Sequence, residues 1–217
     1  MAYAGTGNVL KIQKMLAVIG EHFDDEFEDQ EKKEKSDDEK KQEEKKQAQE
    51  EEDEEEEKDK KNKQEDYRYY QSIATIGISL IALGEELGST MSLRMYNHLI
   101  QYGNIRVKRS VPLALAMLSV SNPLLEISDI LSKLSHDHDE YVSRNAILAL
   151  GIIAAGTNNA RIARMLRSLT NYYQKEADHL YMIRIAQGLV HLGKGLLTLK
   201  CFHSDRFLLN KVSLCGI

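Results

Sequence analysis

Residues 148–156 read LALGIIAAG, and this pattern of small residues recurs along the chain at a constant interval of 37 residues. Two sets of small residues mark the repeat: Gly77, Ala114, Gly151 and Gly188 in the first, and Ala82, Ser119, Gly156 and Gly193 in the second. Self-similarity of this length is typical of stacked helical hairpins, because no single unit buries its own apolar face. We therefore predict an all-α fold, an α-solenoid or toroid segment.

The small residues predict close contacts between neighbouring helices. Glycine in a helix costs ~1 kcal/mol relative to alanine, so its recurrence needs a packing reason. We expect each unit to contain one compact apolar helix on the inside and one amphipathic helix on the outside. All eight positions of the two sets are predicted sites of structural close packing.

The outer helix is indicated by apolar residues at the spacing 0, 3, 4, 7, which places four side chains on one helical face. The clearest ladder is Ile162, Met165, Leu166 and Leu169, and similar ladders occur within residues 12–19 and 127–134. The opposite face of the first ladder carries Arg161, Arg164 and Arg167. We regard these three arginines, with the exposed hairpin end at residues 136–140, as the candidate protein-contact surface.

The charge is divided unevenly along the chain. The net charge of −5 combines a strongly acidic segment, residues 24–66 with 23 Asp and Glu against 11 Lys, with a basic remainder. This segment has almost nothing to bury, so we predict a disordered acidic insertion that is either a spacer or an electrostatic contact, with the basic body of this chain or with a basic partner. Residues 1–23 are then the end of a preceding repeat, and residues 67–217 are the repeat array.

The ends of the predicted helices carry recognisable signals. Asn122 and Pro123 suit the start of one helix, Asp137 or Asp139 the start of a helix near Tyr141, and residues 157–158 the start of the helix after Gly156. After Gly193 the pattern fades, and a new helix is expected near Ser204. The array begins and ends without the polar capping units that such arrays need, so we expect a fragment of a longer protein.

Composition excludes several classes of protein. The longest apolar stretches run to about ten residues, whereas roughly 20 are needed to cross a bilayer, so we expect no membrane partner. The basic residues are scattered without aromatic interleaving, which argues against nucleic acid. Two cysteines without a framework spacing, and no signal peptide, favour a reducing compartment.

Three local motifs invite a catalytic or ligand-binding interpretation. Residues 136–139, His-Asp-His-Asp, could bind metal in a hydrolase, but no matching His and Asp recur on other helices. Cys201 and His203 could form a thiolate–imidazole pair, but both lie on an irregular link. The glycine pairs at residues 5–7 and 193–195 lack the strand that a phosphate loop requires. We therefore expect no enzyme, no catalytic residue, no metal and no cofactor.

The repeats resemble the proteasome/cyclosome repeats, which are HEAT/armadillo-like helical hairpins. The resemblance rests on GTNNAR at residues 156–161, VPLALA at 111–116, SVSNP at 119–123, HLGKG at 191–195 and GNVLKIQKML at 7–16. It is most specific to the large non-ATPase scaffold subunits of the 26S proteasome regulatory particle base. It covers residues 1–23 and 67–217.

The resemblance implies a non-catalytic segment of a closed toroid that supports ubiquitin-dependent protein degradation in the cytoplasm and nucleus. The implied partners are proteasomal ATPase-ring subunits, other regulatory particle subunits, ubiquitin, shuttle proteins with ubiquitin-like domains, and a deubiquitinase. No ubiquitin-docking residue of the family can be matched to a position here. Three alternatives stay open: a sibling toroid or cyclosome subunit, a helical adaptor of another complex with basic or nucleic-acid partners, and a metal-dependent hydrolase using His136 and Asp137.

Overall fold

The computed structural model describes residues 2–20, 68–202 and 209–216. Within these ranges the secondary structure is helical, with one isolated bridge between Phe202 and Leu209 and no strand. The predicted all-α class is therefore confirmed. The predicted insertion at residues 24–66, its disorder, and both of its boundaries lie outside the described residues.

The helices follow one another with short connections. They are α1 (Val9–Gly20), a helix over residues 68–82 (helix 68–82), α4 (Glu86–Tyr102), α5 (Ile105–Leu118), α6 (Leu125–Leu134), α7 (Glu140–Ile153), α8 (Ala160–Tyr172), α9 (Ala177–Val190), the 3-10 turn η1 (Leu192–Gly195) and α10 (Lys211–Leu214). None of the described helices has the length and apolar character needed to cross a membrane.

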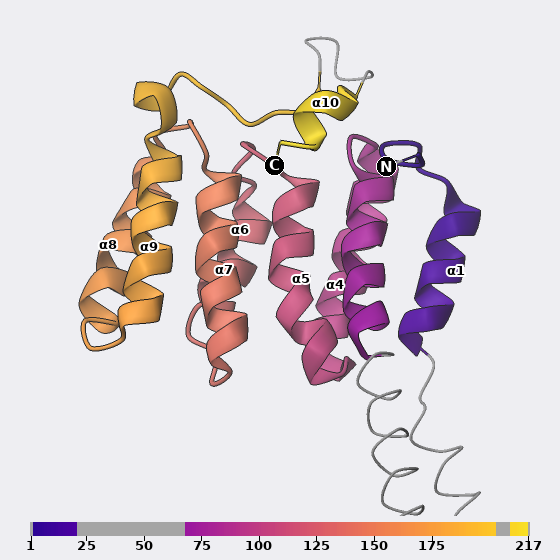
Figure 1. The fold of residues 1–217 in the computed structure, drawn as a ribbon, viewed down its shortest axis with the longest axis horizontal. Coiled ribbons are helices and arrows are strands. Elements are labelled where there is room, and N and C mark those ends of the chain that lie inside the picture. Colours follow the sequence, from indigo (N-terminus) through magenta and orange to yellow (C-terminus); the bar gives the residue numbers. More distant parts are fainter. Residues whose placement is uncertain (1, 21–67, 203–208, 217) are drawn as a thin grey trace, which may run out of the picture.

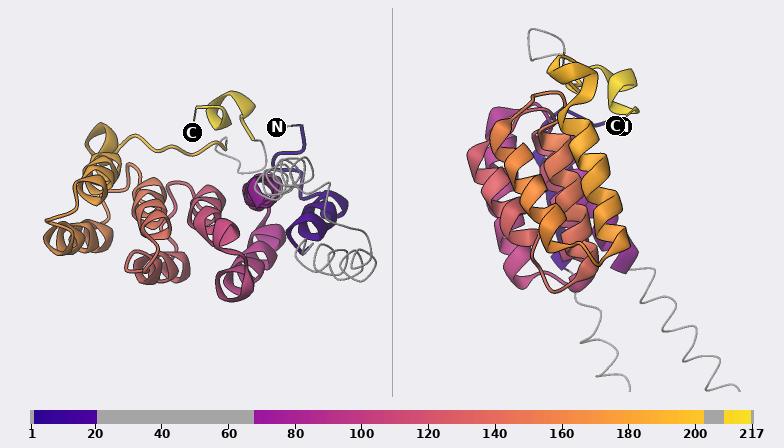
Figure 2. Two further views of the ribbon diagram at one scale, coloured as in Figure 1. Left: turned by 60° about the horizontal axis from the view of Figure 1, so that its bottom comes forward. Right: turned by 90° about the vertical axis from the view of Figure 1, so that its left-hand side faces the viewer.

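The helices form two rows that curve side by side, as Figure 2 shows in its left-hand view. The inner row contains helix 68–82, α5, α7 and α9, and the outer row contains α1, α4, α6 and α8 (Figure 1). Within the inner row, α7 packs against both α5 and α9. Each of the outer helices α4, α6 and α8 packs against the inner helix that follows it. The array is thus the predicted α-solenoid segment.

The apolar ladders explain which face of each outer helix is buried. Ile162, Leu166 and Leu169 are buried beneath α8, and the equivalent ladder of α6 is buried in the same way. Each such side chain contributes roughly 1.5–3 kcal/mol when fully buried. The ladder of α1 packs against the core but is only half-buried, because α1 is the first of the described helices and has a described neighbour on one side.

Each inner helix is followed by a backbone turn in the left-handed region. Gly84, Ser121, Asn158 and Gly195 stand one repeat apart and have φ values of 82°, 51°, 52° and 82°. Residues other than glycine and asparagine rarely adopt this conformation, so Ser121 requires support from its surroundings. Sequence reasoning did not find this repeated turn, because only two of its four residues are glycine.

The turns also bond to the next repeat. The Ser121 amide donates to the Ile152 carbonyl at 3.2 Å, and the Asn158 amide donates to the Val190 carbonyl at 3.3 Å. The last carbonyls of a helix have no partner within that helix. The turns at Ser121 and Asn158 therefore bond to carbonyls at the end of the next inner helix, and this links neighbouring hairpins through the backbone.

The observed N-termini of α6, α7 and α8 can be compared with the predicted N-cap residues. Asp139 is the N-cap of α7, and its carboxylate accepts from the Tyr141 amide at 3.0 Å, as predicted. The cap of α8 is Asn159 rather than a residue of 157–158, because Asn158 is already committed to the left-handed turn. The predicted start at Asn122 and Pro123 is wrong: α6 begins at Leu125 after the extended residue Leu124.

After η1 the chain runs as an extended segment, residues 196–202, across the ends of the inner helices (Figure 1). It reaches the opposite end of the array, where Cys201 and Leu214 pack with Ala4 and Leu83 in a small second core. The predicted helix near Ser204 lies outside the described residues, and α10 occupies Lys211–Leu214.

Candidate protein-contact surfaces

The predicted close-packing positions are mostly buried along the inner row. Ala82, Ala114 and Ser119 are buried, and so is Gly151 in the last turn of α7. A Cβ atom at Gly151 would lie 2.7 Å from the Cα of Ala186 in α9. No side chain fits at that distance, so α7 and α9 approach each other closely at this point.

The other glycines of the two sets have different surroundings. Gly77 faces the side chain of Met15 in α1, and Gly188 is exposed, with nothing within 4 Å of its added Cβ. Gly156 and Gly193 have positive φ and lie against Leu197 of the extended segment. The expectation of a neighbouring helix at Gly156, Gly188 and Gly193 is thus not met. The turn conformation and the extended segment account for Gly156 and Gly193, and α9 is the last described helix of the inner row.

The predicted arginine stripe lies on the outer helix α8. Arg161, Arg164 and Arg167 are all exposed, and Arg161 pairs with Asp129 of α6 at 2.7 Å. Within the described ranges, Arg164 and Arg167 form no ion pair. An exposed pair such as Arg161–Asp129 contributes at most about 1 kcal/mol, so this face presents positive charge that is free for a partner.

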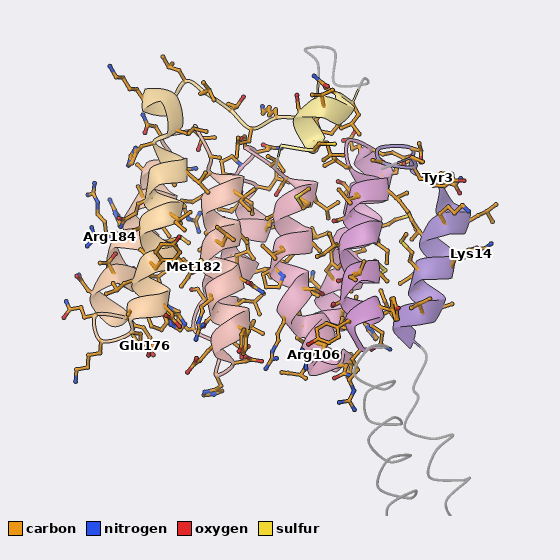
Figure 3. All side chains as sticks on the ribbon, viewed as in Figure 1. Tyr3, Lys14, Arg106, Glu176, Met182 and Arg184 are labelled. Carbon is orange, nitrogen blue, oxygen red and sulfur yellow. The ribbon has the colours of Figure 1, made fainter. Side chains whose placement is uncertain are left out.

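A groove of about 320 Å³ lies beside this stripe between α8 and α9. Its lining combines apolar side chains with cationic or polar ones: Ala163, Leu166, Val190, Arg167, Gln187 and His191. Arg184 points away from the array at the same end, as Figure 3 shows. With Arg167 in its lining and Arg164 exposed nearby on α8, this surface suits a partner segment that carries acidic side chains.

The hairpin end at residues 136–140 joins a network of charged and aromatic side chains. Asp139 pairs with the Nε of Arg109 in α5 at 2.8 Å, and the guanidinium of Arg109 lies 4.4 Å from the centre of the Tyr141 ring. Arg144 pairs with Glu140 and, at 3.1 Å, with Asp178 of α9. These contacts tie α5, α7 and α9 together, so much of this end is occupied by internal interactions.

Burial and hydrogen bonding act in opposite directions on Asp139. Partial burial by itself raises the pKa of Asp139, but the Arg109 guanidinium and the amides of Tyr141 and Val142 outweigh it. The pKa of Asp139 is therefore lowered below its ordinary value of 3.8. The carboxylate stays ionised at neutral pH and serves as a helix cap and ion-pair partner.

A buried histidine between α7 and α9 was not singled out by the sequence. The Nε2 of His179 lies 2.8 Å from the Oγ of Ser143, and its Nδ1 lies 2.6 Å from the Oε2 of Glu176. The ring stacks on Tyr173 at 4.3 Å. This chain of groups resembles a nucleophile, base and orienting acid, but Ser143 is only 1% exposed. A substrate cannot reach it, so the cluster holds helices together.

The motifs considered for catalysis do not assemble sites in the described part of the chain. No group of three or more His, Cys, Asp or Glu side chains there could hold a metal ion, so the metal reading of His136 and Asp137 has no ligand set. Burial raises the pKa of the Cys201 thiol, which keeps it protonated and poorly nucleophilic. His203, its proposed partner, lies outside the described residues.

The comparison with known proteins agrees with this architecture. Residues 145–178, which cover most of α7 and all of α8, match the family model of the proteasome/cyclosome repeat. The chain contains a proteasome/cyclosome repeat.

Similarity extends beyond that repeat to the whole chain. Over 216 residues the chain is 46% identical to the 26S proteasome non-ATPase regulatory subunit 2 of Dictyostelium discoideum. It is 45% identical to homolog A of that subunit in Arabidopsis thaliana and 40% identical to the 26S proteasome regulatory subunit rpn1 of Schizosaccharomyces pombe. All of the chain is covered, but it spans only about a fifth of each relative, 19–20%. The resemblance predicted from the repeats is confirmed.

Proposed function

We propose that this chain is a non-catalytic scaffold segment of a proteasome regulatory particle. The observation that carries the proposal is the sequence identity of 40–46%, over the whole chain, to subunits named as 26S proteasome regulatory subunits. The structure supports a scaffold because it is an array of hairpins with long outer surfaces. The triad-like cluster found in the described part of the chain, around His179, has a buried serine and histidine.

The proposal includes contacts to the ATPase ring and to proteins with ubiquitin-like domains. The surface most suited to them is the α8 stripe with its adjoining groove, because Arg164 and Arg167 are exposed and Arg167 also lines the groove. We further propose that the chain acts in the cytoplasm and nucleus, within ubiquitin-dependent protein degradation.

The test is a binding experiment with the 217-residue chain. Immobilised chain is offered purified ATPase-ring subunits, ubiquitin and a ubiquitin-like domain, and retention is measured with and without residues 24–66. Retention of one of these proteins supports the scaffold proposal, and retention of none of them contradicts it. Loss of binding on deletion of the insertion would assign the contact to the acidic segment.

Charge reversal separates the stripe from the rest of the surface. The double variant Arg164→Glu and Arg167→Glu should reduce retention at least tenfold if the stripe is the contact. Arg94→Glu is the matched control, because Arg94 is an exposed arginine on the outer helix α4. Equal binding by the double variant and the control would remove the stripe from the proposal.

A further inference from the structure

The extended segment at residues 196–202, here called the strap, crosses the array at the ends of its inner helices. It leaves η1 beside α9, passes the ends of α7 and α5, and arrives beside the end of helix 68–82 (Figure 1). The repeat pattern does not account for it, since this stretch contains neither a ladder of apolar residues nor the spacing of the small residues.

The strap contacts each inner helix end that it passes. At the end of α7, a Cβ on Gly156 would lie 1.9 Å from the Leu197 carbonyl oxygen. At the end of α5, the Leu199 amide donates to the Oγ of Ser121 at 2.9 Å, and this hydroxyl donates to the Ala155 carbonyl at 2.9 Å. At the end of helix 68–82, Phe202 lies against Gly84.

These contacts use the left-handed turns. Gly84 and Ser121 are equivalent positions in consecutive repeats, and Gly156 precedes the next equivalent, Asn158, by two residues. The absence of a side chain at Gly84 and Gly156 brings the backbone of the turn close to the strap. The strap therefore lies along the row of turns at the ends of the inner helices.

The far end of the strap is anchored firmly. Cys201 is 2% exposed and packs with Ala4, Leu83 and Leu214. Its carbonyl accepts from the Asn210 amide at 2.8 Å. The anchor thus joins the end of helix 68–82 to the N-terminal turn and to the segment that contains α10.

The strap has almost no slack. Five residues separate Leu197, at the end of α7, from Phe202, at the end of helix 68–82, and they span at most about 16–18 Å when fully extended. The helices at these two points are two positions apart in the inner row, and neighbouring packed helices are typically ~8–10 Å apart. The available length and the distance to be covered therefore agree to within a few ångströms.

We infer that the strap is a taut tie that sets the curvature of the array. In a solenoid each repeat normally contacts only its neighbours, so the angle between hairpins is free to vary by small rotations. Here a bond between residues 78 apart in sequence, Leu199 and Ser121, joins hairpins that the repeat alone does not connect. Any opening of the array on this edge requires the strap to detach, because its backbone cannot lengthen.

The first test lengthens the strap within its taut span. Two glycines are inserted between Thr198 and Leu199 in the 217-residue chain, and the matched control carries the same insertion between Gly195 and Leu196, outside the span. A Cys215→Ser background leaves Cys201 as the single thiol. We expect the first insertion to increase the radius of gyration by X-ray scattering and to raise the labelling rate of Cys201 at least fivefold. Equal behaviour of the two insertions would overturn the inference.

The second test keeps the chain length and removes one contact. Ser121→Ala deletes the hydroxyl that accepts from the strap, and Ser128→Ala is the control, because Ser128 is also buried but bonds within its own helix. The variant also loses the bond to the Ala155 carbonyl, but only the bond from the Leu199 amide involves the strap, and its loss predicts a threefold to tenfold faster exchange of that amide and labelling of Cys201 in Ser121→Ala alone. Unchanged rates, or the same increase in both variants, would contradict a tie at Ser121.

Discussion

Gly151 and Gly188 occupy the same position in consecutive repeats, yet one lies in a close contact between two inner helices and the other is open. The backbone of Ala186 excludes a side chain at Gly151, whereas nothing lies within 4 Å of the equivalent atom at Gly188. The difference arises because α7 has inner-row neighbours on both sides and α9 is the last described inner helix. Equivalence in sequence therefore gives equivalent surroundings only where both neighbours are present.

The largest expected effect on stability comes from placing a side chain at Gly151, the enclosed glycine of this pair. Gly151→Leu places a branched side chain where the Ala186 backbone lies, so α7 and α9 must separate. Overpacking of this kind costs about 1–3 kcal/mol or more, which predicts a melting temperature lowered by several degrees. Thermal unfolding followed by circular dichroism measures the change.

Gly188→Leu is the matched substitution at the open member. The Cβ of the new side chain meets no neighbour among the described residues and leucine favours a helix over glycine, so the melting temperature should stay unchanged or rise by a few degrees. If both variants have the melting temperature of the original chain, the close approach at Gly151 is not important for stability. If both substitutions lower the melting temperature equally, the proposed difference in packing between Gly151 and Gly188 is contradicted.

An effect of intermediate size on stability is expected at the N-cap residues of α7 and α9, the inner helices of the same two repeats. Asp139 and Glu176 are equivalent N-cap residues of α7 and α9, but only Asp139 accepts a hydrogen bond from its own helix start. The pKa of Asp139 is lowered in the folded chain, so its contribution to stability is fully present above the ordinary pKa and is lost as the pH falls through the folded value. Asp139→Asn should cost roughly 1 kcal/mol at pH 7, mainly through the ion pair with Arg109.

The pH dependence distinguishes this charge effect from simple loss of packing. The difference in unfolding free energy between the original chain and Asp139→Asn should shrink as the pH is lowered from 5 to 2, measured by denaturant titration. Glu176→Gln provides the comparison at the array end and should show a smaller change, because the Glu176 side chain is half exposed. A constant difference across this range for Asp139→Asn would show that the carboxylate charge contributes nothing.

The smallest effect is expected from a single methyl group at the open position. Gly188→Ala adds a side chain on an exposed helical site without contacts, where alanine is favoured over glycine by up to about 1 kcal/mol. A rise of one to three degrees in melting temperature follows for a chain of this size. A fall would indicate that another part of the molecule covers Gly188 in solution.

The repeat could be found from sequence because its signal lies in the identity of residues at fixed intervals. The ladder at residues 162–169 predicted the buried face of α8, and Asp139 was one of two candidates for the cap of α7. The candidate surface was predicted less completely. The three arginines were placed on an exposed face, but the groove beside them also needs Gln187 and His191 from α9, which no spacing within α8 could indicate.

The errors share one cause, which is that the decisive neighbour comes from elsewhere in the chain. Gly156 was attributed to packing between hairpins, but it serves a left-handed turn over which the strap passes. His179 was not singled out by the sequence, yet it joins Ser143 and Glu176 in one cluster. A periodicity of 37 residues contains no information on contacts that occur once.

The amino-acid sequence by itself determined the helical hairpins, their stacking and the division into inner and outer rows, because apolar periodicity and small residues act locally and between adjacent units. Only the tertiary structure decided which glycine is enclosed, where the strap runs and how Ser121 holds it. Those features depend on segments far apart in sequence meeting at one edge of the array, such as Leu199 with Ser121 and Phe202 with Gly84, and such distances are fixed by the packed arrangement of all the hairpins together.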